Sequence, residues 1–334
     1  FWDAVEGDLD LPGALALTWD MVRSDLPDQA KLALVLEFDQ VFGLDLDQVP
    51  ADYQVPEPVS AAVEQRKTFR DQADYSSADA LRADVTAGGF LVEDTTRSSR
   101  IRPKTQLEQR EELWPSVSSS REVESVLDRP AQYDFTFILN AYSYPEDIQR
   151  CVNSMLKYRG GFSCQIIVID NGSTDGTGEW LEEFQANHPE MQVIHCDHNV
   201  GDAAGKNIGL KLSLGKNLII MDGSTEIVDD LLSPIGAQLA DETVGILGPY
   251  GLTTNDLQHF HEEVESGEAD AMQAYCMAMR RETVNTVGLM RECFRFYRNL
   301  DIDYCFQFKD RGYRVVADSS LALTRHEHRQ WTEL

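Results

Sequence analysis

The sequence predicts a small α-helical bundle followed by an α/β domain with a mostly parallel, Rossmann-like sheet. The run Ile166–Asp170 is apolar at every position until it ends in an acid, which is typical of a strand buried on both faces. A second run of this kind, Leu218–Asp222, follows about fifty residues later, with helical segments between. Ligands of such sheets bind at the carboxyl ends of the strands, where Asp170 and Asp222 stand.

Composition and charge disfavour several classes of function. The chain has 334 residues, with 57 acidic and 29 basic side chains and a formal net charge of −28. Nonspecific binding to nucleic acid or to anionic membrane is disfavoured, because such a chain repels phosphates. No stretch approaches the roughly 18 apolar residues of a membrane span, and residues 1–6 lack the basic region of a signal peptide. The six cysteines form no CxxC pair, as expected of reduced thiols in a cytoplasmic protein.

Residues 1–104 predict a helical domain. Apolar residues recur there at near-helical spacing. Pro58 suits the first turn of a helix, and Ser77 can cap another. A hairpin is expected over residues 90–102. The predicted helices cover about residues 14–22, 28–42, 59–75 and 78–87.

Several motifs in this region resemble the DALR-type C-terminal region of cysteinyl-tRNA synthetases. The clearest is Ala78–Arg82, which reads Ala-Asp-Ala-Leu-Arg; Leu91–Thr95, Trp2–Ala4 and Leu36–Asp39 add to it. In the synthetases this region is a helical bundle that contacts tRNA. Here residues 1–104 carry 20 acidic and 10 basic side chains, a net of −10, which disfavours tRNA. A bundle used for packing or for homo-oligomer formation is the competing interpretation.

Residues 105–130 are polar and charged, and we expect a linker with a helical piece. From residue 131 to residue 334, strand-like and helix-like segments alternate, which predicts a single α/β domain. The predicted strands are 135–139, 166–170, 192–195 and 218–222.

Six motifs in this second domain occur in an order that resembles family 2 glycosyltransferases, which have the GT-A fold. They are the Tyr142 loop, Asp170–Thr177, Asn199–Gly201 with Lys206–Gly209, Asp222–Ser224, Leu300–Asp303 and Gly312–Val316. The resemblance implies an inverting transferase that moves a sugar from a nucleotide-sugar donor, UDP-linked by expectation, to a hydroxyl acceptor. A divalent metal, Mg²⁺ or Mn²⁺, would assist the transfer.

The resemblance implies that the donor nucleotide lies at the strand ends. Tyr142 would stack on the base, and Asp170 would accept a hydrogen bond from the base ring N–H. Lys206 would face the diphosphate, as would the N-terminus of its helix. A turn-forming role for Asp170 and a solvated position for Lys206 remain open. The expected donor-binding residues are Ala141, Tyr142, Asp170, Asn171, Gly172, Ser173, Lys206, Asp222 and Gly223.

The turn Asp222-Gly223-Ser224 stands where the family has an Asp-x-Asp metal motif. The resemblance therefore implies a metal site of Asp222, Ser224 and His326, with His328 as the second choice for the histidine. Oxygen ligands suit Mg²⁺ and Mn²⁺, which neutralise the charge of the departing diphosphate. Ser224 departs from the family motif, because it replaces the second acid.

Asp301 matches the catalytic base of the family, which takes the proton of the acceptor hydroxyl. Asp303 is a second choice, and Leu300 departs from the glutamate that usually precedes this base. A helix-capping role for Asp301 is the alternative. Two other functions compete with the live enzyme: a nucleotide-binding scaffold with eroded chemistry, and a transferase directed to tRNA by the helical domain.

Overall fold

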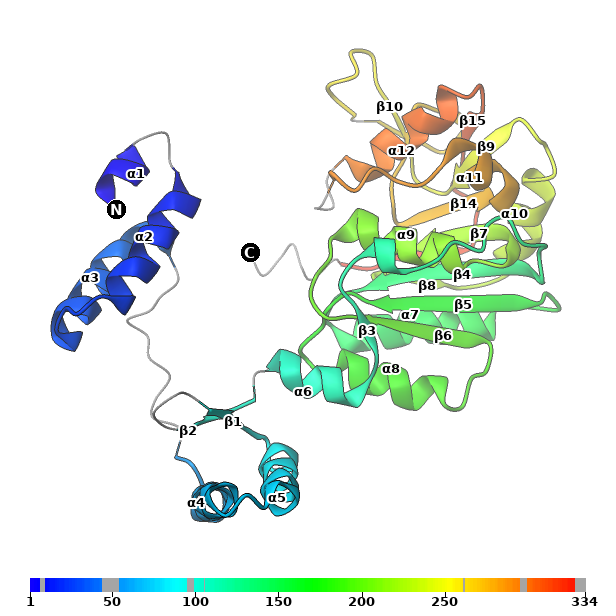
Figure 1. The fold of residues 1–334 in the computed structure, drawn as a ribbon. Helices are drawn as coiled ribbons and strands as arrows, with labels where there is room; N and C mark the ends of the chain where they lie inside the picture. The colour runs from blue at the N-terminus through cyan, green and yellow to red at the C-terminus, as the bar shows by residue number, and fades with distance from the viewer. Residues whose placement is uncertain are drawn as a thin grey trace. The chain divides into compact units, whose positions relative to one another are not determined.

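The computed structural model describes residues 1–6, 10–43, 54–94, 99–104, 106–260, 262–294 and 299–327. The chain divides into two compact units, Phe1–Lys104 and Thr105–Leu334 (Figure 1). In the described ranges, no helix combines the length and the apolar character that a membrane crossing requires.

The first unit is built from helices and one hairpin. Phe1 stacks on Phe38 at a ring distance of 3.8 Å, which joins the chain start to the third helix. The last helix is capped by Asp74, whose carboxylate accepts a hydrogen bond from the Ser77 backbone N–H. The expected Ser77 cap is therefore corrected to Asp74. The elements are α1 (Trp2–Glu6), α2 (Leu11–Arg23), α3 (Asp28–Phe42), α4 (Glu57–Asp71), α5 (Tyr75–Ala87), β1 (Phe90–Asp94) and β2 (Ser99–Pro103).

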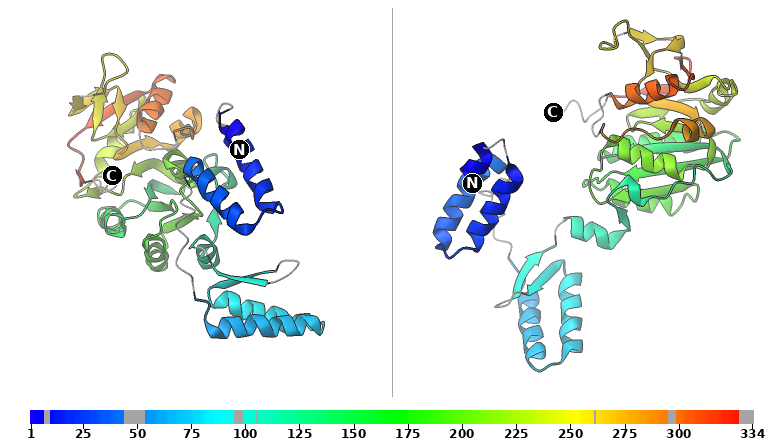
Figure 2. Two further views of the ribbon diagram at one scale, coloured as in Figure 1. Left: turned by 90° about the vertical axis from the view of Figure 1, so that its left-hand side faces the viewer. Right: turned by 45° about the horizontal axis from the view of Figure 1, so that its top comes forward.

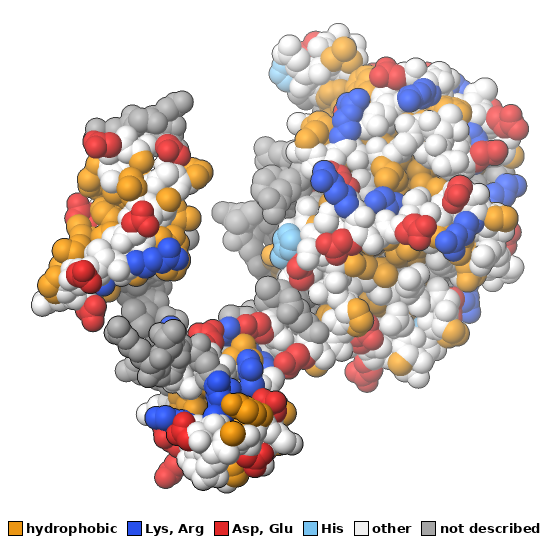
Figure 3. Space-filling view, in the orientation of Figure 1, with side chains coloured by type: hydrophobic (Ala, Val, Ile, Leu, Met, Phe, Trp, Pro, Cys, Tyr) orange, Lys and Arg blue, Asp and Glu red, His pale blue; other side chains and the backbone are white. Residues whose placement is uncertain are grey.

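Helices α2 and α3 carry several exposed large apolar side chains, and apolar side chains gather on this part of the surface in Figure 3. Leu11, Leu15 and Trp19 follow one another at four-residue spacing, so they lie along one face of α2. They are 42%, 43% and 54% exposed. Homo-oligomer formation through this unit stays a prediction.

The second unit contains a large mixed sheet with strand order β12-β15-β9-β14-β7-β4-β5-β6-β3. β4 pairs in parallel with β5 and β7, and β5 pairs in parallel with β6. β14 and β12 run antiparallel to their neighbours. The prediction of a mostly parallel α/β sheet is confirmed. The strands are β3 (Ser116–Val117), β4 (Tyr133–Ala141), β5 (Cys164–Asp170), β6 (Met191–Cys196), β7 (Gly215–Met221), β9 (Val244–Gly248), β12 (Ser266–Ala269), β14 (Cys276–Arg280) and β15 (Arg314–Asp318).

Helices cover both faces of this sheet (Figures 1 and 2). The side chains of β4 alternate between the two cores: Ile138 packs with α9, α11 and α12, whereas Phe137 and Leu139 pack with α7, α8 and α10. Both faces are buried, which explains the uninterrupted apolar runs. The helices are α6 (Gln106–Leu113), α7 (Pro145–Lys157), α8 (Thr177–Gln185), α9 (Asp202–Leu212), α10 (Leu232–Gln238), α11 (Arg281–Val287) and α12 (Leu300–Lys309), with a 3₁₀ turn at Ser120–Glu122.

Much of the expected linker, residues 105–130, packs instead as part of the second unit. After α6, Trp114 is buried and β3 adds a parallel edge strand to β6. Lys211 of α9 donates hydrogen bonds to the carbonyl oxygens of Ser120 and Val123. Backbone pairing with a distant strand is not visible in local composition, so the polar composition of this stretch predicts a linker.

Two small sheets lie beside the large one. β8 (Thr225–Ile227) pairs antiparallel with β16 (Leu323–Arg325), and β10 (Gly251–Thr253) pairs with β11 (Glu262–Val264) and β13 (Ala271–Met272). The first of these pairs brings the chain after Arg325 back to the end of β7, and so joins two segments about 100 residues apart.

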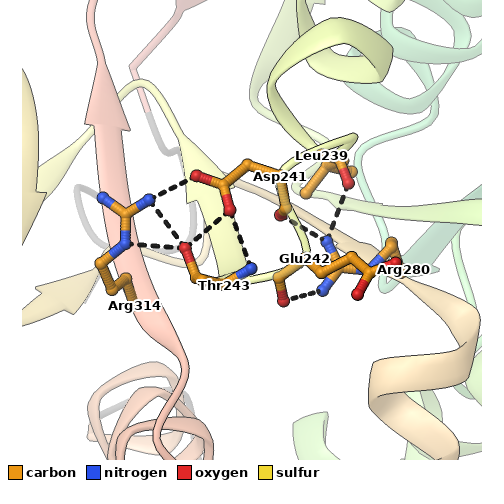
Figure 4. Close-up of polar contacts among 6 residues, drawn as sticks. All are labelled: Leu239, Asp241, Glu242, Thr243, Arg280 and Arg314. Carbon is orange, nitrogen blue, oxygen red and sulfur yellow. Dashed lines mark hydrogen bonds and ion pairs between the residues drawn. The ribbon is translucent and has the colours of Figure 1, made fainter.

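A polar network holds the amino ends of β9 and β15 (Figure 4). Arg280 donates to three backbone carbonyls of the loop 239–243 at 2.7 to 2.9 Å. Arg314 bonds the Asp241 carboxylate at 2.7 Å and the Thr243 hydroxyl at 2.9 Å. Since β9 runs parallel to β7, this network stands at the edge opposite the carboxyl ends of the parallel strands.

Candidate active site

The loop that follows β4 is clamped to the turn that follows β5. Ala141 lies beside Asp170 in the sheet register, and Tyr142, directly after it, is 42% exposed. Ser143 has a φ of 59°, a conformation that costs a non-glycine residue free energy. Its backbone N–H donates to the Ser173 hydroxyl at 2.9 Å. The exposed Tyr142 ring is therefore held by a strained loop, an arrangement that is common at ligand sites.

Asp170 is fully buried at the end of β5. One of its oxygens accepts the Ser173 backbone N–H at 2.9 Å, and the other lies 2.9 Å from Nδ1 of His195. Burial raises the pKa of Asp170, but hydrogen bonds from His195 and Ser173 outweigh this effect and hold the pKa below its usual range. Both oxygens of Asp170 are thus bonded within the protein, as the turn-forming alternative expects, and contact of Asp170 with a nucleotide base stays a prediction.

Asn171 and Gly172 join this turn to the start of α9. Asn171 is buried, and its side-chain oxygen accepts the Val200 N–H at 2.9 Å. Gly172 has a φ of +83°, and a Cβ there would lie 2.6 Å from the His198 carbonyl carbon. Only glycine fits this conformation and this close approach. These contacts hold the turn after β5 next to the N-terminus of α9.

Lys206, one turn into α9, is 3% exposed, so it is not a solvated helix charge. Its Nζ lies 2.6 Å from Asp202, whose other oxygen accepts from Asn140 Nδ2 at 3.1 Å. The Lys206 charge also lowers the pKa of Asp301, although burial has the larger effect on that carboxyl. Lys206 therefore lies between the end of β4 and α12. The sequence did not single out Asp202, which stands at the four-residue spacing of a helical ion pair.

The turn after β7 has a fixed geometry. The backbone N–H and the hydroxyl of Ser224 both donate to Asp222 Oδ1, the first at 2.8 Å. A Cβ at Gly223 would lie 2.7 Å from Ile148 Cδ1, so the turn packs closely against α7. Asp222 N–H donates to the carbonyl oxygen of Tyr275 at 3.0 Å.

The pairing of β8 with β16 places His326 beside this turn. Its backbone N–H donates to the Ser224 carbonyl at 2.8 Å, and its Nε2 lies 2.9 Å from Glu226 Oε2. His326 thus lies beside Ser224 through its backbone, while its imidazole contacts Glu226; the metal site of Asp222, Ser224 and His326 stays a prediction. His328 lies outside the described residues.

The donor chemistry of this group partly fits a divalent metal. It offers a carboxylate, a hydroxyl and an imidazole, a mixture that Mn²⁺ accepts more readily than Mg²⁺. Within the described ranges, no three His, Cys, Asp or Glu residues gather in a way that could hold a metal ion. At this turn Ser224 stands in place of the second acid of the family motif.

Asp301 is the second residue of α12 and is 9% exposed. Its carboxylate accepts the backbone N–H groups of Ala274 at 3.0 Å and Ile302 at 2.9 Å. Burial raises its pKa above the usual range. Asn299 holds the N-cap position without a side-chain hydrogen bond, whereas Asp301 accepts one N–H of the first turn of α12, so its carboxylate also serves the capping alternative.

Two carboxylate-bearing residues therefore meet the same short segment. Asp301 accepts from Ala274, and Asp222 donates its N–H to Tyr275, the next residue. Asp303, the second choice for the base, is instead in an ion pair with Arg291 at 2.6 Å. The sequence did not single out residues 274–275, because their role depends on two contacts with distant parts of the chain.

The second unit has the GT-A fold, and comparison with known proteins gives its family. Residues 136–298 match the sequence model of glycosyl transferase family 2. The chain thus contains a family 2 glycosyltransferase domain. It is 32% identical over 87 residues to glycosyltransferase AglE of Haloferax volcanii, which covers 26% of this chain and 29% of that protein.

The fold resembles the crystal structure of GalNAc-T7 with UDP, GalNAc and Mn²⁺, with a TM-score of 0.51 and 15% sequence identity, over 59% of this chain and 43% of that one. The N-terminal region is related to cysteine–tRNA ligase 1 of Burkholderia lata, with 43% identity over 98 residues, 29% of this chain and 21% of the ligase. The chain spans less than a third of the length of either curated relative.

Proposed function

We propose that the second unit is an inverting glycosyltransferase that moves a sugar from a UDP-linked donor to a hydroxyl acceptor. The observation that carries the proposal is the meeting of Asp222 and Asp301 at residues 274–275. It brings the backbone of Asp222, our candidate metal ligand, and the buried carboxylate of Asp301, our candidate base, to neighbouring positions at the carboxyl ends of the strands, where α/β folds bind ligands.

The donor would lie across the ends of β4, β5 and β7. Tyr142, exposed and held by its loop, would stack on the base. The start of α9 would face the diphosphate with its free N–H groups, and Lys206 would add a positive charge. The turn Asp170–Ser173 would shape the base site through its backbone, since the Asp170 carboxylate is occupied within the protein.

Asp301 would act as the general base. A carboxyl whose pKa is raised by burial is a better proton acceptor near neutral pH than an ordinary one. It would take the acceptor proton as the acceptor oxygen attacks the anomeric carbon opposite the leaving diphosphate, and this geometry inverts the centre. Asp222 and His326 would hold a divalent metal, with the Ser224 hydroxyl as a weak ligand. That metal would supply charge neutralisation for the leaving group.

Donor turnover tests this proposal. The full chain is incubated with UDP-, GDP- and dTDP-sugars, with and without Mn²⁺, and release of the nucleoside diphosphate is measured. Asp222→Ala is compared with Asp241→Ala, the same change at the opposite edge of the sheet. We expect metal-dependent release of UDP that is lost only in Asp222→Ala. Nucleotide binding without turnover would favour a scaffold with eroded chemistry, and the absence of any binding would refute the enzyme.

A second candidate is a transferase directed to tRNA, which the similarity to a cysteine–tRNA ligase favours. The net charge of −10 on residues 1–104 opposes it. Titration of the full chain with tRNA at low and at physiological salt distinguishes a tRNA-directed transferase from one that does not bind tRNA. We expect no saturable binding, and tight binding that weakens steeply with salt would support the second candidate.

A further inference from the structure

Two tyrosines and one arginine form a cluster in the second unit. The guanidinium carbon of Arg325 lies 4.8 Å from the centroid of the Tyr250 ring and 4.9 Å from the centroid of the Tyr275 ring. The two rings meet edge to face, with their centroids 5.7 Å apart. Stacking on aromatic rings restricts a long side chain without using its N–H groups. The guanidinium of Arg325 is therefore held in position while its hydrogen-bond donors stay available.

The cluster lies beside the candidate active site. Tyr250 follows the end of β9, and Tyr275 directly precedes β14, which runs antiparallel to β9. The carbonyl oxygen of Tyr275 accepts the Asp222 N–H, and the N–H of the residue before Tyr275 donates to Asp301. Arg325 is the last residue of β16, which pairs with the strand that follows the Asp222 turn. The cluster is thus connected to both the candidate metal ligand and the candidate base.

The strand order places this cluster on the acceptor side of the site. In the order β9-β14-β7-β4-β5, the donor would lie across the ends of β4, β5 and β7. Tyr250 and Tyr275 adjoin β9 and β14, which lie on the other side of β7 from β4 and β5. Asp301, the candidate base for the acceptor hydroxyl, contacts the residue next to Tyr275. A group bound by this cluster would therefore belong to the acceptor.

The guanidinium of Arg325 has more hydrogen-bond donors than its protein partners use. Arginine carries five N–H donors. Within the described ranges, the Arg325 side chain makes one hydrogen bond, from Nη1 to Glu263 Oε1 at 3.4 Å, and it is 36% exposed. Glu263 is itself 55% exposed, and the same oxygen accepts a shorter bond of 3.1 Å from Gln273. Glu263 is thus a weak partner, and its approach shows that a carboxylate can reach the guanidinium.

We propose that Arg325 is a specificity-determining residue, which binds an anionic group, a carboxylate or a phosphate, on the hydroxyl acceptor. This inference rests on the proposed function. The planar guanidinium forms paired hydrogen bonds with two oxygens of such a group, and these are stronger than its single long bond to Glu263. Tyr250 and Tyr275 keep the guanidinium in place, and the anionic group of the acceptor replaces Glu263.

Two substitutions should have opposite effects on the binding of anionic sugars. In the wild type, an anionic sugar should bind about tenfold or more tightly than its neutral counterpart, and Arg325→Gln should reduce this ratio to about one. Glu263→Gln removes the competing negative charge, so it should raise the ratio and leave the binding of neutral sugars unchanged. If the ion pair only joined β16 to β11, both variants would affect sugar binding in the same direction or not at all.

The experiment measures sugar binding to the full chain by calorimetry in the presence of UDP and Mn²⁺. Glucose, galactose and mannose are each compared with their uronate and their 6-phosphate, so that carboxylate and phosphate are tested separately on the same ring. Wild type, Arg325→Gln and Glu263→Gln are compared with Arg314→Gln, which removes an arginine–carboxylate contact at the opposite edge of the sheet (Figure 4). UDP alone is also titrated into each protein, which measures donor-site binding independently of any sugar.

A wild-type preference for uronates or for 6-phosphates supports the proposal if Arg325→Gln abolishes it, Glu263→Gln increases it and UDP affinity is unchanged. The preferred series then identifies the anionic group. If UDP binds but anionic and neutral sugars bind alike, or if no sugar binds, the acceptor role is overturned and the proposed function stands. The same conclusion follows if Arg325→Gln weakens UDP binding itself, because the guanidinium then serves the donor. If UDP does not bind to the wild type, both are overturned.

Discussion

Asp301→Asn separates catalysis from stability at the proposed base. The substitution keeps the shape of the side chain and removes its charge. A general base contributes about 10²–10⁴-fold to rate, so we expect kcat to fall by about that factor, or about 3–5 kcal/mol in activation free energy. The KM for the donor should change little, because Asp301 faces the acceptor in this mechanism.

The stability of the same variant should change much less than its rate. Asparagine keeps one acceptor for the two N–H groups that Asp301 now binds, and losing a hydrogen bond to a charged group costs about 1.5–3 kcal/mol. Removal of a buried negative charge opposes that loss. We expect the free energy of unfolding at neutral pH to change by less than about 2 kcal/mol in either direction.

The pKa of Asp301 predicts how the stability difference between Asp301→Asn and wild type changes with pH. Burial raises the pKa of Asp301 in the folded chain. Its contribution to stability is therefore present below the unfolded pKa and is lost as pH rises through the folded pKa. Asparagine has no such loss, so the stability of Asp301→Asn relative to wild type should increase over this window. In the same window wild-type kcat should rise with pH, since the base must be ionised.

Urea unfolding at several pH values and steady-state kinetics with saturating donor and acceptor measure these quantities on one preparation. Asp241→Asn, at the far edge of the sheet, is the matched control and should keep its kcat. A kcat for Asp301→Asn within a factor of about ten of the wild type would refute the role of Asp301 as the base.

Three further variants test the site and its supports. Tyr142→Ala should weaken nucleotide binding about 5- to 150-fold, the free-energy contribution of base stacking, and should lower Tm less than a core substitution, because Tyr142 is 42% exposed. Calorimetry measures the affinity, and thermal unfolding measures Tm. Gly172→Ala should destabilise the fold by about 2–4 kcal/mol in urea unfolding, since its Cβ meets His198 at 2.6 Å and its φ is +83°. Asn207→Ala should lower the free energy of unfolding by about as much, because this fully buried amide exchanges two hydrogen bonds with the Met290 backbone. If the free energy of unfolding of Gly172→Ala or of Asn207→Ala fell by less than about 0.5 kcal/mol, that result would contradict these contacts.

The strands of the second unit could be predicted from the sequence because burial on both faces leaves a simple pattern. Runs such as Ile166–Ile169 are apolar at every position, and the structure buries every one of these side chains. The same pattern places the acids that end the runs, Asp170 and Asp222, at the carboxyl ends of the strands. Nothing in this pattern depends on distant residues.

The environment of each acid could not be predicted in this way. Asp170 is buried because His195, 25 residues later, supplies a partner, and because Gly178 lets α8 approach. Asp301 contacts Ala274, which lies 27 residues earlier in the chain, because β14, which follows Ala274, pairs antiparallel with its neighbours in the sheet. A local motif indicates which residues carry chemistry, whereas long-range pairing decides which of their atoms face a ligand.

The burial of Asp301 bears on whether the chemistry has eroded. A buried carboxylate with a raised pKa lowers stability at neutral pH, and its two N–H partners are backbone groups that an asparagine could also meet in part. A scaffold that only binds nucleotide gains nothing from this cost, and proteins retain such local conflicts chiefly at functional sites. Ser224 changes the metal ligands but still orients Asp222 through two hydrogen bonds. The buried carboxylate of Asp301 and the retained orientation of Asp222 both favour a live transferase over a scaffold.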